Sequence, residues 1–397
     1  MRRIFAISLI LLSQNVWAER TTQYFISGTL NTASGSSSNY GNVSGVGNGS
    51  WQSLANQTWK MMPSSGTWQN LRVWLDAAPG VGKSYTVSLM SNGSASGLSC
   101  SVSGTDTKCW NLSSSSFTTI NDVVYMQSTP AGTPTATRVH FAVEFVACTT
   151  NTFVYGPTAQ SISNAVNTFS TITGQRGWAS TENLAQAVFP TSGTFTVIKA
   201  TVTHQPGAGK SYAFTLRKNG ASTSLTCTIS NTNTTCSGES AVSFKPGDLI
   251  GLMSVPTGTP NAPSAGVSLL FISSNTGEFP FFYQNQSGQS ATATNYQAIN
   301  DQNSAGTTTE SQVQAPVIST SPAVQVVNLY GWAQTAPGAG KSWTLSIRRN
   351  GTSPANGPSV TISDTNNFAN PDVIHFSTVT SDDLINFRSV PSGTPTT

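Results

Sequence analysis

Hydrophobic and polar residues alternate in one short stretch of the chain, and the same alternation returns twice further on. In the first copy Tyr85, Val87 and Leu89 stand at every second position, and an Asn-Gly pair follows them. A period of two is typical of a strand with one buried face, and Asn-Gly is typical of a tight hairpin turn. The matching triplets in the other copies are Tyr212, Phe214 and Leu216, and Trp343, Leu345 and Ile347.

Other landmarks keep the same order around each of these strands. A Pro-Gly-x-Gly-Lys-Ser phrase precedes the strand, beginning at Pro79, Pro206 and Pro337. Farther along come an aspartate before an apolar run (Asp122, Asp248 and Asp383) and then a Gly-Thr-Pro phrase (at Gly132, Gly258 and Gly393). Landmarks in such a constant order indicate three tandem copies of one supersecondary plan.

Each copy is expected to be a β-sandwich. No stretch of the chain sustains the 3.6-residue period of a helix with capping residues. Many short strands with frequent turn signals favour an antiparallel sandwich, and each copy is long enough to bury its own core. We predict an all-β chain of three tandem antiparallel, jelly-roll-like sandwiches at residues 19–150, 151–277 and 278–397, with the third lacking its last strand.

The first residues have the layout of a secretory signal peptide. Arg2 and Arg3 precede an apolar run at residues 4–12, and Val16-Trp17-Ala18 stands before the expected cleavage point. This run is shorter than the ~20 apolar residues of a membrane span. We predict that residues 1–18 are removed and that the protein is secreted or at the cell surface, with no membrane span. The alternative is that the run is a buried strand.

The Gly-Lys-Ser end of each repeated phrase is the tail of a phosphate-binding loop, but the rest of that loop is missing. Such a loop needs another glycine five positions earlier, where this chain has Ala77, His204 and Thr335. The glycines are instead expected to supply the positive φ of a turn between two strands. The recurring aspartates are expected to orient turns through hydrogen bonds to the backbone, and Lys83, Lys210 and Lys341 to be solvated loop lysines.

The middle copy resembles a known family in its closing half. Its phrases are LRKNG at 216–220, KPGDLIGL at 245–252 and VSLLFIS at 267–273. In this order they resemble tumour-necrosis-factor-like and complement-like globular domains, which are jelly rolls. Members of that family commonly assemble as trimers of separate chains. The resemblance implies a jelly-roll fold, with the three copies arranged either as a covalent pseudo-trimer or as beads in a row.

The charge content argues against two classes of partner, and the cysteines predict disulfides. The chain has 18 basic and 15 acidic residues without a basic cluster, so nucleic acid and anionic membranes are poor partners. Two cysteine pairs occupy equivalent places in the first two copies, and an exported chain favours disulfides there: Cys100 with Cys109 and Cys227 with Cys236. The same places in the third copy hold Val360 and Ala369.

The fifth cysteine, Cys148, is expected to be either a buried small hydrophobe or a thiol for a partner chain. No metal site is expected, because His140, His204 and His375 all lie away from the cysteine pairs in the sequence. No cofactor is expected either.

The tryptophans gather in the first copy, which holds Trp51, Trp59, Trp68, Trp74 and Trp110. Aromatic faces stack on sugar rings, so Trp51, Trp59, Trp68 and Trp74 are candidate ligand-binding residues. Trp68 and Trp74 have even residue numbers, whereas Leu71 and Val73 in the same strand have odd residue numbers. Both tryptophans should therefore be on the face of the strand that points away from the core. They would then form a glycan platform or be buried between adjacent units.

The sequence shows no carboxylate pair typical of glycosidases, no Gly-x-Ser-x-Gly elbow and no calcium loop, and we predict no enzyme. We expect a secreted, non-catalytic structural or surface protein that acts by assembly or adhesion. The alternatives are a glycan-binding, lectin-like adhesin and a secreted carbohydrate-active enzyme. An open edge in the third copy would also suit self-assembly or a donor strand from another subunit.

Overall fold

The computed structural model describes residues 5–13, 22–27, 32–43, 51–157, 160–173, 178–285, 288–299, 306–316, 324–381 and 383–396. Strands dominate this part of the chain, and its helical elements are three 3-10 turns: η2 (Ala55–Gln57), η3 (Glu182–Leu184) and η4 (Glu310–Gln312). The strands form antiparallel sheets grouped as repeated sandwich-like units, so the predicted fold class is confirmed.

The described part of unit 1 contains ten strands in two sheets. They are β2 (Thr22–Ser27), β3 (Thr32–Ala33), β4 (Asn39–Gly41), β5 (Lys60–Met61), β6 (Gly66–Leu75), β7 (Gly80–Ser91), β8 (Ser94–Gly104), β9 (Lys108–Thr118), β10 (Val123–Ala131) and β11 (Thr137–Ala147). One sheet has the order β4-β10-β7-β8, with β5 also pairing with β10. The other has the order β2-β11-β6-β9, with β3 also pairing with β11.

Unit 2 repeats this plan. Its strands are β12 (Thr152–Tyr155), β13 (Gln160–Ser161), β14 (Thr168–Ser170), β15 (Ala187–Val188), β16 (Gly193–Val202), β17 (Gly207–Lys218), β18 (Ala221–Asn231), β19 (Thr235–Phe244), β20 (Leu249–Thr257) and β21 (Ser264–Ser273). The sheets β14-β20-β17-β18 and β12-β21-β16-β19 correspond strand by strand to those of unit 1.

Unit 3 has the same two sheets, but one of its strands comes from the beginning of the chain. Its own strands are β22 (Glu278–Asn285), β23 (Asn295–Gln297), β24 (Ala315–Pro316), β25 (Val324–Ala333), β26 (Gly338–Arg349), β27 (Ser359–Asp364), β28 (Asp372–Val379) and β29 (Leu384–Ser392). One sheet is β23-β29-β26-β27, and the other is β22-β1-β25-β28, in which β1 is Phe5–Ser13.

Strand β1 stands where β11 and β21 stand in the other units. The edge expected to be open in the third sandwich is therefore occupied. Residues 5–13 form a strand, which was the alternative to a signal peptide for the apolar run. The predicted cleavage point after Ala18 lies outside the described residues, and secretion stays a prediction.

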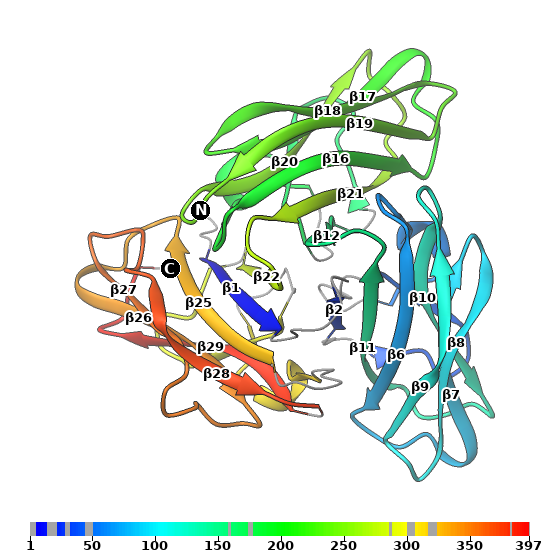
Figure 1. Cartoon of the computed structure of the whole chain (residues 1–397), viewed down its shortest axis with the longest axis horizontal. Coiled ribbons are helices and arrows are strands. Elements are labelled where there is room, and N and C mark those ends of the chain that lie inside the picture. The colour runs from blue at the N-terminus through cyan, green and yellow to red at the C-terminus, as the bar shows by residue number, and fades with distance from the viewer. Residues whose placement is uncertain are drawn as a thin grey trace.

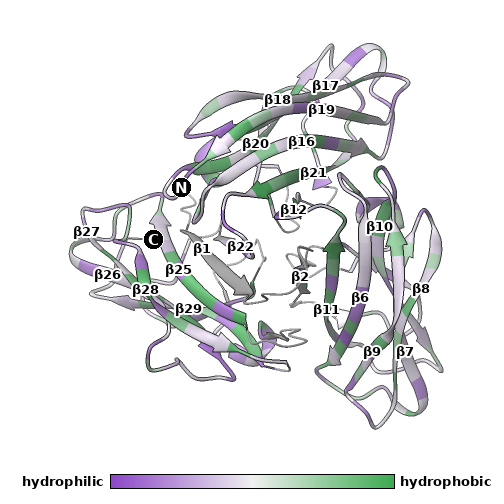
Figure 2. Ribbon diagram, viewed as in Figure 1, coloured by the Kyte–Doolittle hydropathy of each residue, from purple (hydrophilic) through white to green (hydrophobic). Residues whose placement is uncertain are grey.

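The cores form as the alternation predicts. In β7 the side chains of Tyr85, Val87 and Leu89 are fully buried, and the residues between them are more exposed. Hydrophobic and hydrophilic residues follow one another along strands of all three units (Figure 2). Unit 1 has a largely separate core, whereas the buried residues of units 2 and 3 form one continuous cluster.

The three units form a ring in which each unit contacts the next (Figure 1). Strand β5 of unit 1 lies against β21 of unit 2, β15 of unit 2 lies against β1, and β24 of unit 3 lies against β11 of unit 1. Each contact is made on the sheet that holds the strand β11, β21 or β1, which we call the inner sheet. The arrangement is a covalent pseudo-trimer and not a row of beads.

Named side chains join neighbouring units. Between units 1 and 2, the Gln23 amide donates to the Val154 carbonyl at 2.8 Å and accepts from the Val154 N–H at 2.7 Å. Between units 2 and 3, the Tyr155 hydroxyl donates to the Pro280 carbonyl at 2.8 Å, and the Phe282 ring lies 5.8 Å from the Tyr155 ring. These contacts are polar and aromatic together, so the ring is held by more than apolar burial.

Candidate binding surface

The repeated Pro-Gly-x-Gly-Lys-Ser phrases form turns at the start of β7, β17 and β26. In the first phrase Gly80 and Gly82 have φ of 101° and 71°, and in the second Gly207 and Gly209 have φ of 103° and 71°. Residues with side chains rarely adopt this conformation, which explains the glycines. The predicted structural role of the phrase is confirmed.

The recurring aspartates hold the turn before the next strand in the same way in each unit. In unit 2, Asp248 accepts hydrogen bonds from the Asn219 side chain at 2.8 Å and from the Lys245 N–H at 2.9 Å. The Asn219 side chain in turn accepts from the Leu249 N–H at 2.7 Å. Equivalent bonds join Asn92 to Asp122 and Asn350 to Asp383. The expectation that these aspartates orient turns is confirmed.

Burial of the Asp248 carboxyl opposes its ionisation. The hydrogen bonds from Asn219 and Lys245 and the ion pair with Lys218, at 3.1 Å, outweigh this effect, and the pKa of Asp248 is lowered. A carboxylate that stays charged at neutral pH remains a strong acceptor for the turn. These shared residues therefore serve the architecture.

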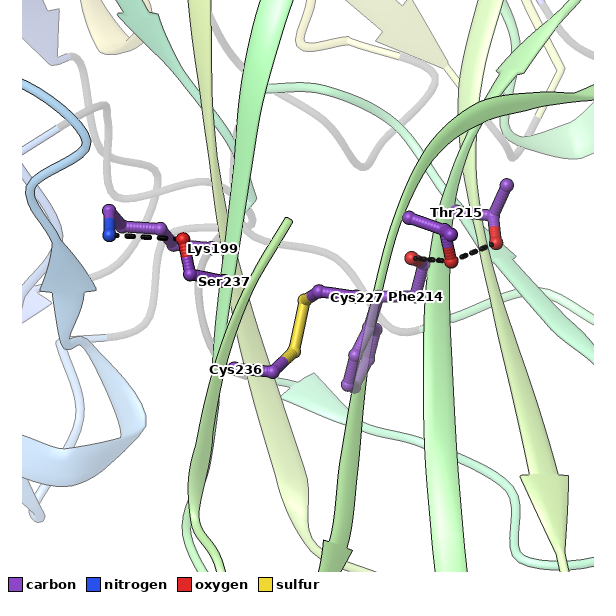
Figure 3. Close-up of a disulfide and its surroundings, with 7 residues drawn as sticks. Lys199, Phe214, Thr215, Cys227, Cys236 and Ser237 are labelled. Atoms are coloured by element: carbon purple, nitrogen blue, oxygen red, sulfur yellow. Dashed lines mark hydrogen bonds between the residues drawn. A yellow bond between two sulfur atoms is a disulfide. The ribbon is translucent and has the colours of Figure 1, made fainter. Parts of the chain in front are cut away.

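The two predicted disulfides are present. Cys100–Cys109 joins β8 to β9, and Cys227–Cys236 joins β18 to β19 beside Phe214 (Figure 3). The partners belong to different sheets, so each bond ties the two layers of its sandwich together. Cys148 is an exposed free cysteine. The expectation of a buried small hydrophobe at this position is therefore wrong, and a role toward a partner chain stays a prediction.

Trp68 lies in the core of unit 1, and the expectation that it faces away from the core is wrong. Its side chain is fully buried, and its Nε1 donates to Thr118 Oγ1 at 3.0 Å. The reason is a bulge in β6 at Asn70, which has a φ of 55° and interrupts the register between Gln69 and Leu71. One extra residue reverses the alternation beyond it.

Trp51 is also buried in this core, at 7% exposure, and Trp59 is partly buried. Of the four tryptophans expected to bind a ligand, Trp74 is the one that the structure places outside the core and beside an exposed ring.

Trp74 and Trp110 form an aromatic pair on the inner sheet of unit 1. Trp74 lies on β6 and is half-buried, while Trp110 lies on the edge strand β9 and is 43% exposed. Their ring centroids are 6.0 Å apart, with an angle of 32° between the planes. Trp110 was not among the predicted ligand-binding residues, because only the β6–β9 register brings it near Trp74.

Two cations flank the exposed ring. Across the two strands, Arg72 pairs with Trp110, and Trp74 pairs with Lys108. The Lys108 Nζ lies 5.2 Å from the centroid of Trp110, and the Arg72 Cζ lies 5.9 Å from it. These distances suit cation–π contacts, which hold the indole in place. Arg72 is buried and its Nη2 donates to Ser381 Oγ of unit 3 at 3.2 Å, so the exposed Lys108 ammonium is the donor beside the ring.

An acidic group lies on the other side of Trp74. His140 pairs with Trp74 across β11 and β6, and its Nε2 lies 2.9 Å from Asp76 Oδ1. Arg138 Nη1 donates to Asp76 Oδ2 at 3.0 Å. Burial opposes ionisation of Asp76, but the hydrogen bonds and charges of His140 and Arg138 outweigh it, and the pKa of Asp76 is lowered. The partly exposed carboxylate is thus an acceptor near the aromatic pair.

We call Trp74, Trp110, Lys108 and Asp76 the tryptophan surface. It presents aromatic faces, donors and an acceptor within one sheet region, which is a combination that binds polar ligands with apolar faces. The surface belongs to unit 1. Trp74 is the ninth residue of β6, and the ninth residue of the matching strand β16 in unit 2 is Thr201. In the matching strand β25 of unit 3 it is Trp332, whose ring centroid lies 6.2 Å from that of the exposed Phe368.

Within the described ranges, no group of three or more His, Cys, Asp or Glu side chains could hold a metal ion. The described part of the chain also contains no helix that is both long and apolar enough to cross a membrane. A comparison with known protein families and with curated protein sequences found no match.

Proposed function

We propose that this protein is a secreted, non-catalytic surface or structural protein that acts by assembly and adhesion. The features shared by all three units serve turns and sheets, as shown for the glycine phrases and for Asp248. The features that differ between units include exposed apolar side chains on edge strands. The two disulfides support an oxidising, extracellular location.

The strongest support for assembly is a set of exposed apolar side chains on the edge strand β28. Val373, Ile374 and Phe376 are 54%, 79% and 47% exposed. Among the described residues, β28 pairs with β25 along one side, and its other side is the edge of the sheet. An exposed apolar edge favours association with another surface.

A bulge holds these side chains outward. The three residues between Asp372 and Phe376 stand opposite the single residue Asn328. The Asp372 carboxylate accepts from the Ser359 N–H at 2.9 Å and from the His375 N–H at 3.1 Å. The exposed conformation is therefore fixed by hydrogen bonds, and this supports a surface prepared for contact with a partner.

Sedimentation velocity tests the assembly. We expect the sedimentation coefficient of the wild type to rise with concentration and that of the Ile374→Ser variant to rise much less. Val81→Ser is the matched control, because Val81 is 85% exposed but lies in the first glycine phrase. A wild type that stays monomeric over the accessible concentration range, or equal effects of both substitutions, would contradict assembly through β28.

Carbohydrate binding is the second candidate function, and the tryptophan surface supports it. Sugars offer apolar ring faces that stack on indoles, and hydroxyl groups that bond to cations and carboxylates. The half-exposed pair of Trp74 and Trp110, with Lys108 and Asp76 beside it, offers all of these contacts.

A glycan array followed by titration tests this candidate. Trp110→Ala should weaken the binding of any glycan found by roughly tenfold, which corresponds to ~1.4 kcal/mol. The control is Phe117→Ala, because Phe117 is 60% exposed on the same strand β9 and lies outside the tryptophan surface. The absence of hits for the wild type, or unchanged affinity in Trp110→Ala, would refute it.

A further inference from the structure

Strand β1 lies between β22 and β25 and is antiparallel to both. Residues 5–12 pair with β22, and residues 5–13 follow β25 from Ala333 back to Val324. The sheet of unit 3 is therefore continuous only because a segment from the other end of the chain lies within it (Figure 1).

The register of β1 is the register of β11 and β21. Ser13 pairs with Val324, the first residue of β25, as Ala147 pairs with Gly66 at the start of β6. In unit 2, Ser273 pairs with Gly193 at the start of β16 in the same way. Three segments with unrelated sequences thus adopt one alignment.

Strand β25 itself sets this alignment. It has a bulge at Asn328, with a φ of 57°, where the register of β1 shifts between Ser8 and Ile10. Strand β6 has its bulge at Asn70, with a φ of 55°, and the register of β11 shifts at the equivalent place. A bulge in the receiving strand pins the incoming strand, because any other alignment would leave the bulge opposite paired residues.

The surroundings of β1 are apolar and belong to two units. On β22, Phe281, Phe282 and Tyr283 are at most 1% exposed, and on β25, Val326 and Leu329 are fully buried. Strand β15 of unit 2 lies against β1, so the segment between β22 and β25 is also part of the ring contact between units 2 and 3.

We propose that the place between β22 and β25 is a peptide-binding site. It binds an extended segment with alternating apolar residues, antiparallel to both neighbours, and residues 5–13 are its occupant in the intact chain. Phe5, Ile7, Leu9 and Leu11 are the occupant's apolar residues at every second position, and Ile10 and Leu12 add apolar residues between and after them. Two rows of backbone hydrogen bonds provide affinity, and the buried surroundings select for apolar residues at every second position.

This site is compatible with both interpretations of the N-terminal segment, as a removable signal peptide and as a strand of unit 3. A chain that keeps residues 1–18 closes its own ring. A chain from which they are removed presents the site to an extended segment of another polypeptide, and the segment that fits it resembles β11, in which Val139, Phe141 and Val143 alternate in the same register.

A cut chain tests the proposal. The full chain is produced without export, with a specific protease site inserted between Ala18 and Glu19, and is then cut and passed over a native size-exclusion column. We expect fragment 1–18 to elute with the body of the protein, as detected by mass spectrometry. A synthetic peptide of Thr137–Ala147 in excess should displace the fragment and elute in its place, whereas a peptide of the same composition in permuted order should not.

Proline variants show whether the fragment is retained as a strand. Leu9→Pro places a residue without an N–H in the middle of β1, and its fragment should be released after cutting. Asn15→Pro changes the same fragment outside β1 and should leave retention unchanged. The proposal is overturned if the wild-type fragment elutes alone, if the Leu9→Pro fragment is retained like the wild type, or if both peptides displace it equally.

Discussion

Lys60 is a buried base at the contact between units 1 and 2. It lies on β5, its side chain is 1% exposed, and its Nζ lies 2.8 Å from the Gly156 carbonyl of unit 2, to which it donates. Burial removes most of the water that would solvate the ammonium group and lowers the pKa of Lys60 from 10.5 to about 7.

This pKa shift makes the stability of the protein depend on pH. Below pH 7 both the folded and the unfolded chain bind the Lys60 proton, and folding carries the full penalty of burying a charge. Between pH 7 and 10.5 the unfolded chain binds more protons than the folded chain, so stability rises with pH. At ~1.4 kcal/mol for each pKa unit, the whole penalty is on the order of 5 kcal/mol.

The variant Lys60→Met should therefore change stability in a direction that depends on pH. At pH 6 to 7 we expect it to unfold at a higher denaturant concentration than the wild type, because it buries no charge. Near pH 10 the penalty of the wild type has almost vanished, and the variant still leaves the Gly156 carbonyl without its donor, which costs ~1–3 kcal/mol. The order of the two proteins should then reverse.

Urea unfolding followed by tryptophan fluorescence, at steps from pH 6 to 10, measures this effect. Lys210→Met in the second glycine phrase is the control and should leave the pH profile unchanged. The role of Lys60 is refuted if Lys60→Met is less stable than the wild type at every pH, or if the difference in stability between the two proteins does not change with pH.

Three further variants test a turn, a disulfide and a contact between units. Asp248→Ala should lower the free energy of unfolding by ~1–3 kcal/mol at neutral pH in urea titrations, because the turn before β20 loses its acceptor. Since the pKa of Asp248 is lowered in the folded chain, this difference in stability should fade as the pH drops through that pKa. Equal stability of the variant and the wild type at pH 7 would contradict the role of Asp248 in the turn. The double variant Cys100→Ser, Cys109→Ser should have a free energy of unfolding lower by ~3 kcal/mol on the chain-entropy model, and a melting temperature below that of the wild type. No change in melting temperature would show that the disulfide does not stabilise unit 1. Tyr155→Phe removes the donor to Pro280 between units 2 and 3 and should lower stability by ~1 kcal/mol in the same titration, and an unchanged midpoint would exclude a contribution of this bond to the ring.

Local patterns in the sequence were sufficient for the elements and their repetition. The alternation at Tyr85, Val87 and Leu89 predicted a strand with one buried face, and the positive φ of Asn92 and Gly93 confirms the hairpin that follows it. Such features depend on residues close to each other in the chain, so a single sequence carries them. The cysteine pairs could be predicted because a pair recurs at equivalent places in two copies.

The direction of Trp68 and the pairing of Trp74 with Trp110 required the tertiary structure. A bulge at Asn70 decides which side of β6 faces the core, and nothing in the alternation of the residues around it marks the extra residue. Trp110 approaches Trp74 only through the register between two strands. Side-chain direction and cross-strand neighbours depend on register, which is set by contacts between distant segments.

The sequence by itself determined that the chain is built from strands and turns in three copies, because strand formation and turn geometry follow from neighbouring residues. Only the tertiary structure decided that the copies close into a ring and that residues 5–13 complete the third sandwich. A strand finds its place by satisfying backbone hydrogen bonds on two sides and burying one apolar face, and several segments of this chain meet those conditions. The choice among them belongs to the whole fold.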